Sequence, residues 1–420
     1  MKNRYRYSLL LAFLLSMVFA ACDNDTELLF EETATERKKA AISEYDNALK
    51  SSANGWAFEY FPDKNQSFGG YNFVLKFDDH DKLMVWYEGI QLLSTSVSST
   101  YDIISYGGPV LSFDTFNNIL HQFANPSRYE YNAKGGDFEF LLMSHNADTI
   151  HLKGTKTGNL MRLIKLNERP AEYLQKVRDV QEYLKKATFG TSINNIPVEV
   201  LLSGRHLMFN YEEEGEEKSE ILPFIYTPGG IRLYESTEIL GKEFQEFTLQ
   251  KSEEKLVSDQ LALSVVFPPI DLSEWWWIYD INKETENCAA IKAVYDEVYN
   301  ANALRWGEKL YPKVCFGKSL RDGSTEIGLS FVSTTTSSYY VAHYNVLFTG
   351  VYGHDDYINM HLAGNGFNWS WYTHLEPFVN FITENAPYKI EIDDDKNPSK
   401  IKFTSVDKPE IWFHLDKLAF

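Results

Sequence analysis

The strongest constraint on the fold is a pattern that occurs three times along the chain, an amphipathic helix followed by a run of short alternating strands. Helical periodicity of the apolar residues predicts helices at 33–52, 170–187 and 286–310. After each helix, apolar and polar residues alternate over short segments that are separated by turn residues, which is typical of antiparallel strands. Because each sheet must bury one face, we predict an α+β fold in which helices cover the sheets.

The repeated pattern divides the chain into three units. We predict unit 1 at 33–167, unit 2 at 168–270 and unit 3 at 271–420. Each unit is a helix plus an antiparallel β-meander that forms a curled sheet or a partial barrel. The units agree in pattern more than in residue identity. True internal repetition is one explanation of the pattern, and the features that all β-meanders share are the alternative explanation.

Composition narrows the class of protein. Of the 420 residues, 44% are hydrophobic and 15% are aromatic, which excludes disorder for most of the chain. The 40 basic residues against 59 acidic residues give a formal charge of -19. Nucleic acid is therefore not an expected partner, because its phosphates require a basic face.

Residues 1–22 have the pattern of a lipoprotein signal peptide. Basic positions precede an apolar run that is too short to span a bilayer, and two alanines stand directly before Cys22. This arrangement resembles the bacterial lipobox, although Phe19 occupies the place where leucine is usual. We expect removal of residues 1–21 and lipidation of Cys22. A plain secretory signal with an incidental cysteine is the alternative.

An acidic tether follows, at residues 22–32. It resembles the surface-export signal of Bacteroidetes lipoproteins, and a simple solvated spacer explains it as well. Loss of the signal peptide removes three basic residues and no acidic ones, which takes the formal charge from -19 to -22. Anionic head groups repel such a charge, so acyl chains would hold the protein at the outer membrane. Which face of that membrane it occupies, the cell surface included, stays open.

Several sequence phrases resemble a known family. They are SSANGWAFEYFPD, KNQSFGGYNFVLKF, GPVLSFDTFNNILHQFANPS, GGDFEFLLMS and GTKTGNLMRLIKL. With the lipobox, they resemble the Bacteroidetes lipoproteins catalogued as domain-of-unknown-function family 4302, most specifically over residues 50–166. The resemblance implies a lipoprotein near outer-membrane nutrient-uptake proteins of the SusC/SusD type. It implies no catalytic residues, because the family has none assigned.

Metal-binding patterns are weak. The acidic segment 393–397 alternates acids as calcium loops do, but it lacks their glycine and their final glutamate, and a hairpin turn explains it more simply. Zinc would need about three converging ligands. We expect no metal and no cofactor, and the rival is a metal-assisted hydrolase built from side chains of unit 3: His343, His354, His361, His374, Asp355 and Asp356.

Two cysteines remain after Cys22, namely Cys288 and Cys315. A compartment beyond the inner membrane permits disulfides. Two cysteines in a chain of this length are no disulfide framework, and whether they form a bridge stays open.

The aromatic residues provide the candidate binding site. If residues 275–277, three consecutive tryptophans, form a strand, they cannot all face one core. At least one should be exposed or cover the boundary between units 2 and 3. A second aromatic group follows two glycines at 367–372. Exposed tryptophan and tyrosine can stack on sugar rings or anchor an interface, with packing inside the protein as the alternative. The predicted ligand-binding residues are Trp276, Trp369, Trp371 and Tyr372.

Together these features predict a lipid-anchored outer-membrane protein that binds a glycan or a peptide without catalysis, as an accessory to nutrient uptake. No glycine-rich phosphate loop, nucleophile elbow or HExxH motif is present in the sequence. The rival hydrolase and a purely structural assembly partner remain alternatives.

Overall fold

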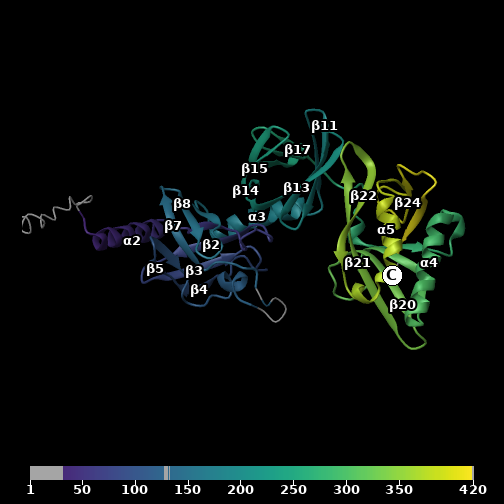
Figure 1. The fold of residues 1–420 in the computed structure, drawn as a ribbon, viewed down its shortest axis with the longest axis horizontal. Helices are drawn as coiled ribbons and strands as arrows, with labels where there is room; N and C mark the ends of the chain where they lie inside the picture. The colour runs from purple at the N-terminus through teal and green to yellow at the C-terminus, as the bar shows by residue number, and fades with distance from the viewer. Residues whose placement is uncertain (1–31, 127–130, 132, 419–420) are drawn as a thin grey trace, which may run out of the picture.

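A computed structural model describes residues 32–126, 131 and 133–418. Three β-rich units follow one another in chain order, from the purple end to the yellow end of Figure 1. The predicted signal peptide, Cys22 and the tether up to residue 31 lie outside the described residues. Within the described part, no helix combines the length and the apolar character needed to cross a membrane.

Unit 1 consists of helix α2 (Ala34–Lys50) and a nine-stranded antiparallel sheet. The helix begins at a capping box, in which the Thr33 hydroxyl accepts from the Glu36 backbone N–H and the Glu36 carboxylate accepts from the Thr33 N–H. Buried Tyr45 and Leu49 join the core of the sheet. The strands are β1 (Trp56–Tyr60), β2 (Tyr71–Phe77), β3 (Lys82–Tyr87), β4 (Val97–Thr100), β5 (Asp102–Ser105), β6 (Pro109–Ser112), β7 (Glu139–His145), β8 (Thr149–Gly154) and β9 (Leu160–Lys165).

The sheet of unit 1 is an open, curled meander. Its order is β4-β3-β2-β1-β9-β8-β7-β6-β5, so the first strand pairs with the last. The two edge strands, β4 and β5, follow each other in the chain with only Tyr101 between them. The sheet therefore approaches a barrel without closing.

Unit 2 consists of helix α3 (Pro170–Leu184) and a closed eight-stranded barrel in which β10 pairs with β17. Pro170 stands in the first turn of α3, where its missing N–H is not needed. The strands are β10 (Thr188–Ile193), β11 (Ile196–Ser203), β12 (His206–Glu213), β13 (Glu216–Thr227), β14 (Gly230–Ile239), β15 (Lys242–Gln250), β16 (Lys255–Val257) and β17 (Ala262–Val266).

Unit 1 has its own core, and part of its sheet also packs into the core of unit 2. Ala57 and Val74 of the first sheet belong to the same buried cluster as α3 and the barrel of unit 2. A buried carboxylate also joins the units, since Glu59 accepts from Nε of Arg162 at 2.6 Å and from a guanidinium N–H of Arg232. Units 1 and 2 are therefore one packed body.

Unit 3 is a second closed eight-stranded barrel with two helices, α4 (Ala289–Trp306) and α5 (Glu376–Glu384). It departs from the helix-first order, because β18 precedes α4 and pairs with β25 to close the barrel. The strands are β18 (Trp276–Asp280), β19 (Lys309–Lys318), β20 (Ile327–Thr334), β21 (Tyr339–Val351), β22 (His354–Asn365), β23 (Tyr388–Ile392), β24 (Lys400–Ser405) and β25 (Trp412–Lys417).

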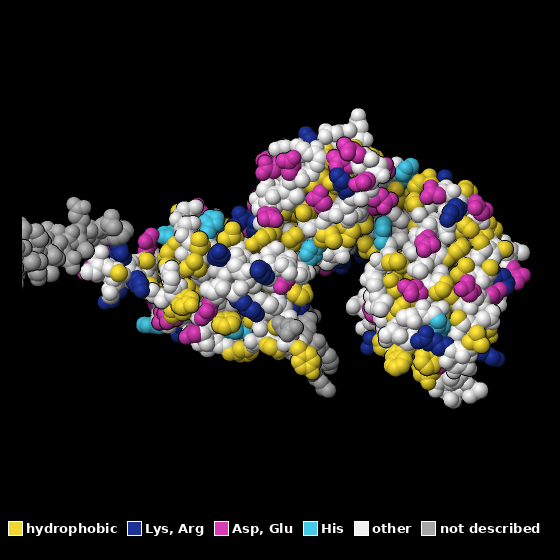
Figure 2. All heavy atoms as spheres, viewed as in Figure 1, with side chains coloured by type: hydrophobic (Ala, Val, Ile, Leu, Met, Phe, Trp, Pro, Cys, Tyr) yellow, Lys and Arg dark blue, Asp and Glu magenta, His cyan; other side chains and the backbone are white. Residues whose placement is uncertain are grey.

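The predicted fold class is confirmed: the protein is α+β, with one curled sheet and two barrels of antiparallel strands. Unit 3 has its own core, which contains no buried side chain of units 1 and 2. Close contacts still join units 2 and 3. The Thr188 hydroxyl donates to the Gly350 carbonyl at 3.2 Å, and the backbone at Gly190 lies against Tyr352. Figure 2 shows a furrow between unit 3 and the rest of the molecule.

Candidate ligand-binding cavity between units 2 and 3

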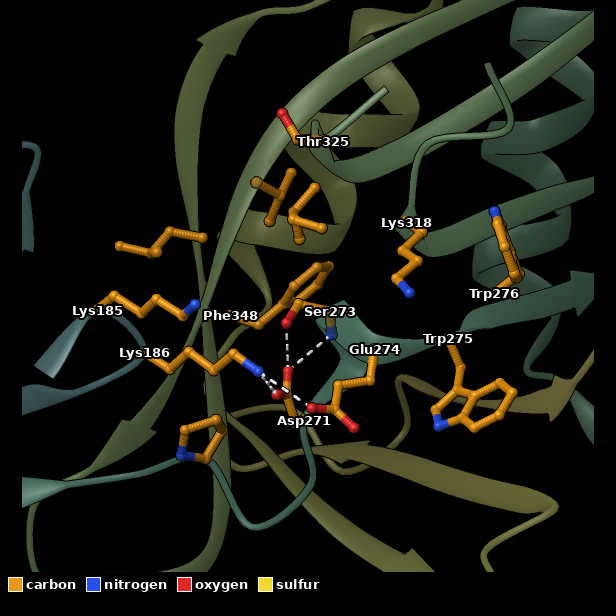
Figure 3. Close-up of a pocket in the computed structure, with 14 residues that line it drawn as sticks. Lys185, Lys186, Asp271, Ser273, Glu274, Trp275, Trp276, Lys318, Thr325 and Phe348 are labelled. Carbon is orange, nitrogen blue, oxygen red and sulfur yellow. Dashed lines mark hydrogen bonds and ion pairs between the residues drawn. The ribbon is translucent and has the colours of Figure 1, made fainter. Parts of the chain in front are cut away.

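A cavity of about 700 Å³ lies where the end of α3, the linker before β18 and the barrel of unit 3 meet (Figure 3). Its lining combines aromatic rings, lysines, two carboxylates and aliphatic side chains. The lining residues are Lys185, Lys186, Pro268, Asp271, Ser273, Glu274, Trp275, Trp276, Lys318, Thr325, Ile327, Val346, Leu347 and Phe348.

Gly317 positions the tryptophan segment. It has φ +96°, and a Cβ there would lie 2.3 Å from the Leu272 carbonyl oxygen and 2.4 Å from that of Trp275. Only glycine tolerates both the conformation and the close approach. The linker can therefore lie directly on β19, where the Lys318 N–H donates to the Trp275 carbonyl at 3.1 Å.

The three tryptophans take three environments: Trp276 and Trp277 alternate as neighbours in a strand do, and Trp275 precedes the strand. Trp277 points into the barrel of unit 3 and is 1% exposed. Trp276 points outward into the cavity, and its indole N–H donates to the Ser319 carbonyl at 3.1 Å, which fixes the ring. Trp275 is 43% exposed. The prediction that the triplet cannot share one core is confirmed.

Two lysines lie over these tryptophan rings. The Lys318 ammonium is 5.5 Å from the centroid of the Trp276 ring, and the Lys417 ammonium is 3.9 Å from that of Trp275. In the described part of the chain, neither ammonium has a carboxylate oxygen within 4.0 Å. In Figure 3 the Lys318 amine points into the space between Phe348 and the two tryptophans. Sequence reasoning missed both lysines.

The opposite wall of the cavity carries charged side chains that form ion pairs with one another. Lys186 pairs with Asp271 and, at 3.3 Å, with Glu274. Partial burial works against the charged form of Lys186, but the hydrogen bond and the charge of Asp271 outweigh it, so the pKa of Lys186 is raised. Asp271 also accepts from the Ser273 N–H at 2.9 Å. These contacts tie the linker to the end of α3.

The other predicted binding residues lie away from this cavity, in unit 3. Trp369 is 1% exposed and packs against Phe331 and Tyr344, so its ring is part of the core. Tyr372 is also buried, and its hydroxyl donates to Glu308 at 2.9 Å. Neither ring offers a face to a ligand outside the protein.

Trp371, in contrast, is 61% exposed. The segment folds as a 3₁₀ turn, in which residues three apart lie on the same side, so Trp369 and Tyr372 face inward and Trp371 faces outward. The Trp306 indole N–H donates to the Trp371 carbonyl at 3.2 Å, and the two rings are 6.2 Å apart. Trp306 and Trp371 form an exposed aromatic pair separate from the cavity.

The four histidines of unit 3 lie at four separate places. His343 is fully buried and hydrogen-bonds Ser330, and His374 hydrogen-bonds Asn302. His354 stacks on a tyrosine ring, while His361 lies near Glu199 of unit 2. Burial lowers the pKa of His343, His361 and His374. Across the described ranges, no three His, Cys, Asp or Glu side chains gather as a metal site would need.

The acidic segment 393–397 is a hairpin turn between β23 and β24. Asp393 accepts from the Ser399 hydroxyl and from the Ser399 and Lys400 N–H groups, and these hydrogen bonds, the hydroxyl first, lower its pKa to about 2. Its oxygens are thus engaged by the protein itself.

Cys288 and Cys315 are buried free thiols, so they form no disulfide with each other.

The fold and the cavity define a three-unit β protein with a ligand-sized space between its second and third units. The sequence profile described as domain of unknown function (DUF4302) matches residues 26–251, which cover unit 1 and most of unit 2. The chain belongs to this family. Among curated proteins, none matches the chain.

The chain is only remotely similar to solved structures, as two examples show. The DNA polymerase sliding clamp from Pseudomonas aeruginosa is 9% identical, with 91% of this chain and 98% of that chain covered and a TM-score of 0.13. A putative DNA polymerase III beta subunit from Eubacterium rectale is also 9% identical over the same shares, with a TM-score of 0.14. Scores this low do not establish a shared fold.

Proposed function

We propose that the protein is a lipid-anchored outer-membrane protein that binds a glycan or a peptide without altering it and supports nutrient uptake. The observation that carries the proposal is the cavity lined by Trp275 and Trp276. Its volume of about 700 Å³ lies within the range of about 300–1,000 Å³ typical of ligand sites. Trp275 is 43% exposed, and it lines this space together with Trp276, so the cavity has an aromatic wall of the kind that stacks on sugar rings.

The lining suits binding more than catalysis. Lys186, Asp271 and Glu274 are engaged with one another, and this network joins the linker to α3. The histidines on which the rival hydrolase depends lie apart from the cavity and from each other. A binding protein therefore accounts for the site with fewer assumptions.

The arrangement of the units fits an anchored binder. The described chain starts at residue 32, and helix α2 lies at the end of the molecule opposite unit 3 (Figure 1). A lipid on Cys22 would then place the cavity away from the membrane, where it can meet ligands or an uptake partner.

The binding claim is tested with the mature protein on an array of neutral and acidic oligosaccharides and peptides, with hits measured by isothermal titration calorimetry. We expect Trp276→Ala to weaken the best hit at least about tenfold through loss of the stacking surface. Trp371→Ala is the matched control and should bind as the wild type does. Equal binding by Trp276→Ala and the wild type would contradict the proposed site.

The anchor is tested by fractionation. Cys22→Ala should release the protein from the membrane fraction, and continued membrane retention would refute the lipid anchor. Protease treatment of intact cells then distinguishes the two faces of the outer membrane.

Mass spectrometry of the recovered ligand tests the absence of catalysis, since an altered ligand would favour the rival hydrolase.

A further inference from the structure

We infer that acid opens the loop 319–326, which borders the cavity between units 2 and 3, and that the buried side chain of His343 is the group that responds to pH. The site would then hold its ligand near neutral pH and release it in acid. That consequence rests on the proposed function, whereas the movement of the loop does not.

The loop forms part of the cavity wall. It connects β19 with β20, and its residue Thr325 lines the cavity (Figure 3). At the start of the loop, the Ser319 carbonyl accepts the indole N–H of Trp276 at 3.1 Å. The Ser319 N–H in turn donates to the Glu326 carbonyl at 3.0 Å, which closes the loop. A change in the loop therefore reaches the aromatic wall of the cavity.

His343 lies under this loop. Its neighbours in β21, Ala342 and Tyr344, belong to the core of unit 3, so the alternation of the strand turns His343 away from that core. The side chain is nevertheless fully buried, and its Nδ1 is 2.8 Å from the Ser330 hydroxyl oxygen. The same oxygen accepts the Leu320 N–H at 3.2 Å. Ser330 therefore joins the imidazole ring to the backbone of the loop.

The surroundings of His343 suit a neutral ring. Its Nε2 has no hydrogen-bond partner among the described residues, and no described carboxylate oxygen lies within 4.0 Å of either ring nitrogen. Burial lowers the pKa of His343 and outweighs the charge of Glu326 and the Ile327 carbonyl, which both favour the charged form. An added proton would therefore create a buried cation without a close counter-charge.

Two further titratable groups on the elements around the ring, Cys315 and Arg321, cannot supply that counter-charge. Cys315 is the residue opposite Ser330 on β19, and burial raises the pKa of its thiol to about 12, so it stays neutral. On the other side, the Phe367 carbonyl accepts the His343 N–H at 2.9 Å, and the Arg321 guanidinium lies 4.1 Å from the centroid of the Phe367 ring. Its charge has the same sign as that of an imidazolium.

Acid therefore shifts the loop from a closed to an open position. While the loop is in place, burial opposes protonation of His343. Once the loop moves away, water reaches the ring and its pKa returns toward the usual 6.5. The open state then binds more protons than the closed state, so its population rises as the pH falls below 6.5.

Hydrogen exchange followed by mass spectrometry tests this movement without any ligand. The amides of residues 319–326 are compared in the wild type and in His343→Gln at the same pH, which cancels the intrinsic pH dependence of exchange. We expect the wild type to exchange faster than the variant at pH 5.5 but not at pH 7.5. His145→Gln, which alters a histidine of unit 1, is the matched control and should respond to pH as the wild type does.

If His343→Gln does not fold, the wild type alone decides, with the rates of unprotected amides as the reference at each pH. Unchanged protection of the loop at pH 5.5 would overturn the inference. A loss of protection that His343→Gln shares would overturn the role of His343.

Calorimetry of the best ligand from the array then tests release in acid. We expect weaker binding at pH 5.5 than at pH 7.5 in the wild type and a smaller difference in His343→Gln. Equal binding at both pH values by a wild type whose loop opens would overturn release in acid and leave the proposed function standing. An opening loop in a protein that binds no glycan or peptide would refute the proposed function and support the loop movement.

Discussion

Replacement of Glu59 by glutamine should strongly destabilise the body formed by units 1 and 2. Glu59 is 1% exposed, and its carboxylate is shared by Arg162 and Arg232. Arg162 would keep an ion pair with Glu246 at 3.1 Å. The Arg232 side chain is only 8% exposed, and within the described chain its Nε already has no hydrogen-bond acceptor. The substitution would therefore leave a buried guanidinium without its counter-charge.

The size of the effect follows from this geometry. Removal of one partner of a buried ion pair costs about 3–5 kcal/mol, and the retained contact of Arg162 places this case near the lower end, at about 3 kcal/mol. For a body of this size, that corresponds to a decrease in Tm of about 6–12 °C. Because unit 3 has a separate core, its own unfolding transition should not move.

Scanning calorimetry and urea unfolding of the mature protein measure both transitions. Glu391→Gln breaks an exposed pair with Lys402 in unit 3 and, as the control, should cost less than about 0.5 kcal/mol. A double variant, Glu59→Gln with Arg232→Met, should recover part of the loss because no unpaired charge remains in the interface. A loss below about 1 kcal/mol in Glu59→Gln, or an equal shift of both transitions, would refute this reasoning.

Three further predictions concern unit 3. Burial holds the pKa of His343 below its usual 6.5, so the folded state binds fewer protons than the unfolded state below that pH. Stability should then fall as the pH drops below 6.5, and urea titrations of His343→Gln should show a flatter profile. The Asp393 carboxyl should titrate near pH 2 by NMR. Its stabilisation is present above pH 3.8 and is lost as the pH falls toward 2, and a pKa near 4 would contradict the turn geometry. Gly317→Ala should destabilise unit 3 by about 1–3 kcal/mol or more and weaken ligand binding, whereas Gly323→Ala, which meets open space, should retain binding.

Locally encoded features were the ones that the sequence predicted well. The helix predicted at 170–187 is α3, and Pro170 marks its start, because helix initiation depends on the backbone preferences of a few residues. The opposite facing of Trp276 and Trp277 follows from strand alternation alone.

Features that depend on tertiary structure were not predicted. The placement of β18 before α4 follows from closure of the barrel through β25, which is more than a hundred residues away in the chain. Lys417 approaches Trp275 only because that closure brings β25 beside β18. The burial of Trp369 and Tyr372 depends on a 3₁₀ turn within a glycine-containing segment, which has no clear sequence signal.

The most direct test of the account is a crystal structure of the mature protein with the tightest-binding glycan or peptide from the array. The account predicts the ligand in the cavity between units 2 and 3, against the wall that Trp275 and Trp276 form. A ligand bound at the exposed pair of Trp306 and Trp371, with the cavity empty, would contradict it.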